Sequence, residues 1–194
     1  MTLRCSERND KMKHVLKDCR NGGEAVYKTE LEIWEKDERL YFKFRAEHTQ
    51  YYCPYDHYND IHSEGDACEI LIGSDPKRQL YYEIEISPKN CLMLAKMQYC
   101  GDDDQGNPVL KIDFIKDCFL SSRVTLFDGG YEAEISFDKK DIMTGEGEIY
   151  FNAYRLETDG GEMEKHLFAL IPTMKGKFHV PTKYDYLKKY CEIL

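Results

Sequence analysis

Hydrophobic and polar side chains alternate along most of the chain, in short runs that turn residues separate. Residues 27–33 alternate Tyr, Thr, Leu and Ile with Lys and Glu, and the alternation resumes over 40–46 after the polar turn 35–38. A period of two residues is typical of a strand with one buried and one solvated face. These two runs therefore predict an antiparallel hairpin.

The same pattern predicts further strands, while helical periodicity is weak and fits only a short segment, 11–20. Asp128-Gly129-Gly130 is a strong hairpin signal. The stretch 167–187 contains Pro172 and Pro181, which restrict it to edge or loop geometry. The fold class is therefore expected to be all-β, an antiparallel two-sheet β-sandwich of immunoglobulin-like or jelly-roll-like type with few short helices. The additional expected strands are 67–72, 80–87, 91–97, 123–127, 131–137 and 148–156.

Two segments interrupt the strand pattern. Residues 51–65 are rich in tyrosine and irregular, which indicates a long ordered loop at the edge of the sandwich. Residues 101–108 are acidic but lack the residue order of a calcium-binding loop, so they predict a solvated hairpin loop. The length of 194 residues predicts one domain, 1–194, with a core at about 24–187 and an N-terminal extension at 1–23.

Charge and composition narrow the classes of partner. The net charge of −9 argues against nucleic acid, which requires clustered Lys and Arg. No run approaches the roughly 20 apolar residues of a membrane span, and the N-terminus lacks the apolar core of a signal peptide, so we expect a cytoplasmic protein that binds no membrane. The eight cysteines show no close pairing and are expected to be free thiols. The oligomeric state is left open.

A family resemblance rests on the order of five short motifs. Residues 65–72, Gly-Asp-Ala-Cys-Glu-Ile-Leu-Ile, resemble the Asp-x-x-Glu strand opening of the family 9 carbohydrate-binding modules. The matching region covers about 24–187, nearly the whole chain. The resemblance implies a sandwich of the wider DOMON-like superfamily that binds carbohydrate without catalysis and without a cofactor. The other four motifs are 81–88, 130–135, 151–155 and 178–181.

The resemblance also implies site residues. It gives Glu69 and Asn152 hydrogen bonds to sugar hydroxyls, which planar carboxylate and amide groups can hold in pairs. The two tryptophans that enclose the sugar in that family are absent, and Ser63 and Arg155 stand in their neighbourhoods. Tyrosines of the loop 51–58 are expected to supply aromatic faces instead. The expected residues for a mono- or oligosaccharide are Glu69, Asn152, Arg155, Asp66, Tyr55 and Tyr58.

Two other functions remain open from the residues. A small sugar-active enzyme or enzyme subunit would use two strand carboxylates as acid and base, provided that they converge in one pocket. Alternating strand glutamates are, however, usually the solvated face of a sheet. A haem-binding DOMON-like domain would use a methionine and a histidine as axial ligands. The candidate carboxylates are Glu69, Glu83, Glu85, Glu132 and Glu134, and the candidate haem ligands are Met93, Met97, Met163, His166 and His179.

Metal binding is not expected from local spacing. Asp56, His57, Asp60 and His62 are dense, but their spacing on an irregular loop matches no recurrent ligand geometry. A structural calcium ion elsewhere in the fold remains open, because some members of the family resembled contain one.

Overall fold

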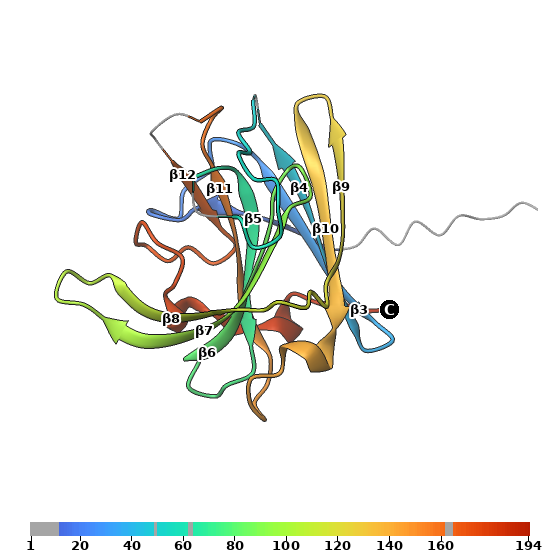
Figure 1. The fold of residues 1–194 in the computed structure, drawn as a ribbon. Helices are drawn as coiled ribbons and strands as arrows, with labels where there is room; N and C mark the ends of the chain where they lie inside the picture. The colour runs from blue at the N-terminus through green and yellow to red at the C-terminus, as the bar shows by residue number, and fades with distance from the viewer. Residues whose placement is uncertain (1–11, 49, 62–63, 162–164) are drawn as a thin grey trace, which may run out of the picture.

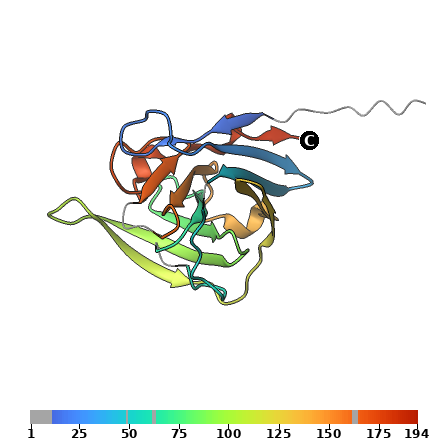
Figure 2. The same cartoon turned by 90° about the horizontal axis from the view of Figure 1, so that it is seen from above.

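A computed structural model describes residues 12–48, 50–61, 64–161 and 165–194. Two β-sheets face each other across a hydrophobic core, which confirms the predicted antiparallel β-sandwich (Figure 1). The hairpin of β7 (Leu92–Asp102) and β8 (Pro108–Phe114) projects from the rest of the described chain, as the view from above shows (Figure 2).

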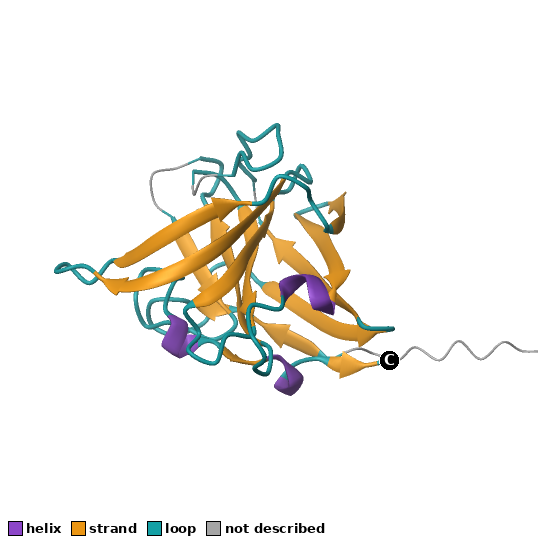
Figure 3. Ribbon diagram, turned by 60° about the horizontal axis from the view of Figure 1, so that its bottom comes forward, coloured by secondary structure: helices purple, strands orange, loops and turns teal. Residues whose placement is uncertain are grey.

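The helical part of the described chain consists of short 3₁₀ turns (Figure 3). Within these residues, none of the helices has the length and apolar character that crossing a membrane requires. The turns are η1 (Lys139–Ile142), η2 (Pro181–Lys183) and η3 (Leu187–Lys189).

One sheet has six strands in the order β1-β3-β4-β10-β9, and β14 pairs in parallel with β3. The β3–β4 turn, Asp37-Glu38, has positive φ at both residues, as a two-residue type I′ hairpin requires. The strands are β1 (Lys13–Val15), β3 (Thr29–Lys36), β4 (Arg39–Glu47), β9 (Ser121–Phe127), β10 (Gly130–Asp138) and β14 (Glu192–Ile193).

The other sheet has eight strands in the order β2-β12-β11-β5-β6-β7-β8, and β13 also pairs with β11. Its central strand β5 is buried along its whole length, so both faces of this sheet are covered there. The strands not yet given are β2 (Lys17–Asp18), β5 (Ala67–Gly73), β6 (Leu80–Ile86), β11 (Tyr150–Glu157), β12 (His166–Ala169) and β13 (Asp185–Tyr186).

The main core fills the space between the sheets. Alternate residues of each strand point inward, for example Phe42 and Phe44 on β4, Ile70 on β5 and Ile84 on β6, all with no exposed surface. The opposite, outward face of the eight-stranded sheet has a second apolar cluster, which includes Leu71, Tyr81, Met97, Tyr154 and Tyr184. The segment that follows β12 covers part of this outward face (Figure 1).

The structure corrects the sequence interpretation near the N-terminus. The short helix considered for 11–20 is wrong over the described part, because β1 and β2 occupy it and extend one sheet each. Leu16 and Cys19 are almost completely buried, so pairing with β3 and β12 overrides local preference. The described part of the 1–23 extension is therefore built into both sheets. Strand β8 was also missed.

Candidate functional site

Three glutamates gather on the outward face of the eight-stranded sheet. Glu69 on β5 lies directly opposite Glu85 on β6 in the antiparallel register. Glu83, two residues before Glu85, points to the same face because side chains alternate along a strand. Glu69 is also opposite Tyr154 on β11, and Glu85 is opposite Met93 on β7. Strand pairing alone thus places three carboxyl groups side by side.

These carboxyl groups are buried. Glu69, Glu83 and Glu85 are 6%, 8% and 9% exposed. A carboxylate oxygen of Glu69, one of Glu83 and a ring nitrogen of His179 all lie within 4.8 Å of one another. Glu69 Oε1 has no hydrogen-bond partner among the described residues. A buried polar atom without a partner is costly, which makes this atom a sign of something the site binds.

Burial and mutual repulsion dominate the electrostatics of the cluster. Burial, followed by the charges of Glu83 and Glu85, holds the pKa of Glu69 well above its ordinary value of 4.5. Burial and then the charge of Glu83 likewise hold the pKa of Glu85 well above 4.5. Among the described residues, one of these three carboxyl groups has an ion-pair partner: Glu83 pairs with His179. Among the described residues, Glu69 and Glu85 thus have no cationic partner, and both resist ionisation.

His179 is held in place by aromatic neighbours. Its Nδ1 lies 2.9 Å from Tyr81 Oη, and its Nε2 lies 3.3 Å from Glu83 Oε1. The preceding residue, Phe178, stacks on Tyr154 with ring centroids 4.3 Å apart, and its carbonyl accepts a hydrogen bond of 2.9 Å from Tyr154 Oη. The loop that presents the imidazole is therefore fixed to the sheet.

A cleft opens beside His179, between that loop and the β7–β8 hairpin. Its volume is ≈ 220 Å³, and its lining includes Tyr99, Asp102, His179 and residues 180–182. Lys177 donates a hydrogen bond to the carbonyl of Gly106 at the hairpin tip, so the two walls touch at one end. Lys175 at this rim pairs with Asp102 at 3.9 Å.

An apolar stripe lies on the other side of the carboxyl groups. Phe114 of edge strand β8 is opposite Ala95 of β7, and Ala95 is opposite Glu83 of β6, so all three face outward. Phe114 is 44% exposed, and Ile112 on the same face of β8 is 52% exposed. Ala95 itself is completely buried, so Phe114 is the exposed member of this row of three residues.

Asn152 is on this face but is used by the protein itself. It is completely buried, and its amide nitrogen donates to Tyr154 Oη at 2.9 Å and to the carbonyl of Ile171 at 2.8 Å. Its side-chain oxygen accepts from the amide of Ile171 at 3.0 Å. The structure therefore brings Asn152 beneath the loop that carries His179 and does not bring it to the open part of the face.

The prediction that Arg155 lines the same cleft as Glu69 is corrected. Arg155 points to the inner face of the sheet, is completely buried, and forms an ion pair with Glu157. Burial raises the pKa of Glu157 to about 7, against the opposing attraction of Arg155. Asp66 is also completely buried, and its carboxylate accepts from the amide and hydroxyl of Thr158. Both residues organise the interior at the end of β11.

The loop tyrosines are structural in their contacts. Tyr55 is 3% exposed, and its hydroxyl accepts hydrogen bonds from the amides of Glu64 and Gly65. Tyr58 donates to the carbonyl of Ile115 at 2.8 Å, and burial raises its pKa to about 12. The loop 51–61 packs on Ala67 and Met93 at one end of the outward face. Ser63 lies outside the described residues.

The other candidate sets do not converge in the same way. Within the described residues, Glu69, Glu83 and His179 form the one group of three potential metal ligands that come this close. Of the loop set, Asp56, His57 and Asp60 are described and His62 is not. Met163 likewise lies outside the described residues, and the haem alternative stays a prediction. In the acidic 101–108 loop, Asp103 accepts hydrogen bonds from the amides of Gln105 and Asn107, as expected for a hairpin turn.

Sequence reasoning missed two contributors to the site. Tyr81, which holds His179, lies in the quoted motif 81–88 but was not given a role. Phe114 was missed because β8 was missed. The carboxylates Glu83 and Glu85 were considered only for an enzyme, although their period of two with Tyr81 already places all three on one face.

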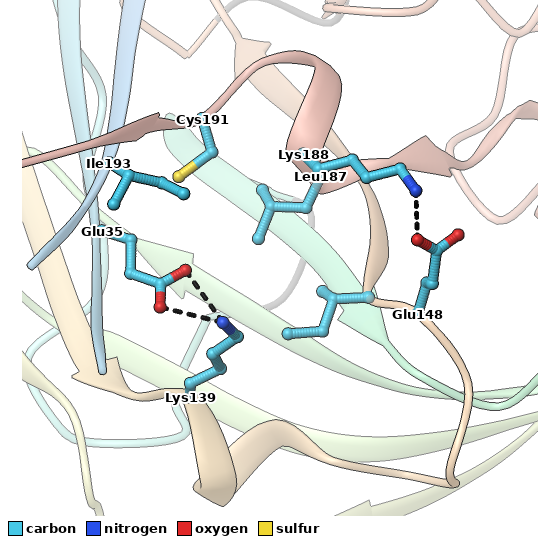
Figure 4. Close-up of a pocket in the computed structure, with 8 residues that line it drawn as sticks. Glu35, Lys139, Glu148, Leu187, Lys188, Cys191 and Ile193 are labelled. Carbon is cyan, nitrogen blue, oxygen red and sulfur yellow. Dashed lines mark hydrogen bonds and ion pairs between the residues drawn. The ribbon is translucent and has the colours of Figure 1, made fainter. Parts of the chain in front are cut away.

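A second pocket, of ≈ 250 Å³, lies near the C-terminus (Figure 4). Its charges are compensated: Lys139 contacts both carboxylate oxygens of Glu35, at 2.8 and 2.9 Å, and Lys188 pairs with Glu148. Burial raises the pKa of the Cys191 thiol to about 11, so it is protonated at neutral pH and is a poor nucleophile. The outward face with its uncompensated carboxyl groups is the stronger candidate.

Comparisons with known proteins bear on the fold. Neither the family models nor the curated proteins contain a match to this chain. Among solved structures, a "putative carbohydrate-binding protein" from Bacteroides uniformis has a TM-score of 0.71 at 11% identity, over 96% of this chain and 88% of that chain.

Two structures of a family 9 carbohydrate-binding module from Caldicellulosiruptor kristjanssonii are also similar. The cellotriose complex has a TM-score of 0.58 at 10% identity, over 95% of this chain and 83% of that chain. The glucose complex has a TM-score of 0.56 at 10% identity, over 93% and 84%. The chain therefore has the fold of a family 9 carbohydrate-binding module.

Proposed function

We propose that this protein is a non-catalytic carbohydrate-binding protein that holds a mono- or oligosaccharide on the outward face of the eight-stranded sheet. The observation that carries the proposal is the buried carboxyl cluster of Glu69, Glu83 and Glu85, in which Glu69 Oε1 has no partner among the described residues. Sugar hydroxyls are neutral donors that could occupy such acceptors.

The surroundings of the cluster match the two surfaces of a sugar ring. A pyranose presents hydroxyls around its rim and C–H groups on its faces, and aromatic rings pack on the C–H faces. Here the exposed Phe114 lies in the same outward-facing row as Glu83 and the buried Ala95, so we place the C–H face of the sugar on Phe114. In this proposal Phe114 takes the stacking role of the missing tryptophans.

The similar folds support the same class of ligand. Family 9 modules of this fold have been captured with glucose and with cellotriose. Five of the six expected contacts are revised in the proposal, because they are engaged in protein contacts: Asn152, Arg155, Asp66, Tyr55 and Tyr58. Glu69 is retained, with Glu83, Glu85 and Phe114 added.

A sugar-active enzyme is the second candidate, and the convergence of Glu69 with Glu83 favours it. A glycosidase requires two carboxyl groups on either side of the scissile bond, one of them with a raised pKa as the acid. The pKa of Glu69 is raised by burial, as an acid would require. Release of product from aryl glycosides, abolished by Glu83→Gln, would favour this candidate over simple binding.

The proposed function is tested by thermal unfolding against a panel of mono- and disaccharides at millimolar concentration, in the presence of EDTA. A ligand that binds only the folded state raises the unfolding midpoint. We expect at least one sugar to raise it in the wild type and to lose the effect in Glu83→Gln. The absence of any shift across the panel would contradict the proposal.

The matched control for Glu83→Gln is Glu134→Gln. Glu134 also lies on a strand, but it faces outward from the six-stranded sheet beside Lys43 and Arg123. We expect Glu134→Gln to keep the full sugar response. Equal loss of response in both variants would place the binding elsewhere.

A further inference from the structure

The site contains a ligand set that a sugar does not require. Glu69, Glu83 and His179 each direct one donor atom to a common point, with all three atoms within 4.8 Å of one another. We propose that this point binds a divalent transition-metal ion through Glu69, Glu83 and His179. The proposal does not depend on sugar binding, although it uses two of the same side chains.

The side chain of Glu69 is the independent sign of a missing cation. It is 94% buried, and its Oε1 has no partner among the described residues. Glu83 and Glu85 add like charge on the neighbouring strand. A divalent cation would compensate two of these charges at once, which a neutral ligand cannot do.

The donor types indicate the class of ion. Two carboxylate oxygens and one imidazole nitrogen suit manganese, iron, cobalt or zinc, whereas calcium and magnesium bind oxygen donors almost exclusively. Ligand atoms on a tetrahedral ion at about 2.1 Å stand roughly 3.4 Å apart. The three donors would therefore move together by roughly 1 Å, which rotation of two glutamate side chains provides.

His179 has the second contact that a metal-binding histidine needs. Its Nδ1 lies 2.9 Å from Tyr81 Oη, so an Nδ1–H can donate to the phenol oxygen and leave the Nε2 lone pair toward Glu83. The Phe178–Tyr154 stack and the Tyr154 hydrogen bond to the Phe178 carbonyl fix the backbone beside it. Both strands that carry the glutamates are central in the sheet.

Three protein ligands would leave coordination positions open. These open positions would face the outward side of the sheet, where Glu85 also lies. Water, Glu85 or a vicinal pair of hydroxyl groups could complete the coordination. An ion here would thus also be positioned to contact a bound sugar.

The test is a titration of the metal-free full-length protein with Mn²⁺ in the absence of sugar. The EPR signal of free Mn²⁺ measures how much of the ion is bound. Manganese is the chosen probe because the chain has free cysteines, whose thiolates prefer softer ions such as zinc. We expect one site, and at least tenfold weaker binding in Glu69→Gln, Glu83→Gln and His179→Gln. His179→Gln keeps an amide that can bond Tyr81, so the loop is retained.

Two variants control for non-specific binding. His166→Ala removes a histidine of β12, and Glu134→Gln removes a carboxylate of the six-stranded sheet. Both are expected to bind Mn²⁺ as the wild type does. The metal proposal is overturned if no site is detected, or if the three ligand variants bind as tightly as the controls.

The two proposals fail separately. Mn²⁺ is titrated without sugar, and the sugar panel is run in EDTA. A sugar response without a manganese site would leave the carbohydrate proposal standing and remove the metal, and the reverse result would do the opposite. Circular dichroism of each variant establishes that loss of binding is not loss of fold.

Discussion

The outward faces of the two sheets carry glutamates at alternating strand positions, but the two faces differ in whether these glutamates have basic partners. On the six-stranded sheet, Glu132 pairs with Lys43 at 3.0 Å and with Arg45 at 2.9 Å, and Glu30 pairs with Lys28 at 2.7 Å. On the eight-stranded sheet, Glu69 and Glu85 face each other and are buried. The same sequence pattern thus produces a compensated surface and an uncompensated one.

The difference between the two faces indicates which carboxyl groups are available to a ligand. A paired, half-exposed carboxylate changes the free energy of unfolding little, so such residues can cover a solvated surface at almost no cost in stability. A buried carboxylate without a cation lowers stability and persists where a ligand restores the balance. We therefore interpret the first face as a solvated surface and the second as a binding site.

The largest expected effect concerns the interior between the two faces, where a buried charge is paired. Arg155→Met leaves Glu157 buried without its cation and is expected to lower the free energy of unfolding by about 3–5 kcal/mol. Urea denaturation measures it. The double variant Arg155→Met/Glu157→Gln is expected to recover more than half of the loss. A double variant as unstable as the single one would show that the arginine acts by packing alone.

Asn152 offers the next effect, because it lies on the binding face but is satisfied by the protein. Asn152→Ala leaves the amide and carbonyl of Ile171 without partners and is expected to cost about 2–3 kcal/mol. Denaturant unfolding would be compared with Asn107→Ala, an exposed residue of the hairpin tip, expected within about 0.5 kcal/mol of wild type. Equal, small effects would mean that Asn152 is not a structural residue.

The paired face predicts a small effect that depends on pH. Burial raises the pKa of Glu132, but the pairs with Lys43 and Arg45 outweigh burial and hold this pKa below its ordinary value of 4.5. Its contribution is therefore complete above pH 4.5 and is lost as the pH falls through the lowered pKa. Glu132→Gln should cost about 0.2–1 kcal/mol at neutral pH and nothing near the acid limit. Unfolding measured at several pH values checks this, and a cost independent of pH would refute the ion-pair explanation.

The smallest effect on stability is expected at the apolar stripe. Phe114 and Leu126 are exposed hydrophobic residues on edge strands of different sheets, 44% and 53% exposed. Phe114→Ala and Leu126→Ala should each change the free energy of unfolding by less than about 0.5 kcal/mol. Only Phe114→Ala is expected to weaken a sugar identified by the panel, about tenfold, as measured by calorimetry. Identical affinities in the two variants would remove Phe114 from the site.

Local patterns predicted most of the fold, because the alternation of hydrophobic and polar residues that indicates a strand is visible within a few residues. The β5 and β6 strands were predicted to within one residue at each end. Strand β8 was missed although Leu110, Ile112 and Phe114 alternate with Lys111 and Asp113 and carry the same signal. The incorrect helix at 11–20 reflects the opposite case, in which distant strands determine the structure.

The site was less predictable, because its chemistry depends on strand order. Glu83 and Glu132 look alike in sequence, and only the folded structure reveals that Glu83 lies close to Glu69 whereas Glu132 pairs with Lys43. His179 is 96 residues from Glu83, and no spacing rule connects them. Arg155 was assigned by its neighbourhood in a motif, yet alternation along β11 turns it to the inner face, opposite to Asn152.

The comparison of the two faces is tested most directly by the same substitution made on each. Glu69→Gln and Glu132→Gln would be unfolded in urea at neutral pH, with EDTA and without sugar. Folding at neutral pH must either bury the charge of Glu69 or protonate it, and both cost free energy. A glutamine at 69 avoids this cost and can donate to Glu83 or Glu85, so we predict an increase in the free energy of unfolding of about 1 kcal/mol. Glu132→Gln is predicted to decrease it. A decrease in both variants would contradict the account, because Glu69 would then be satisfied within the protein and would need no ligand.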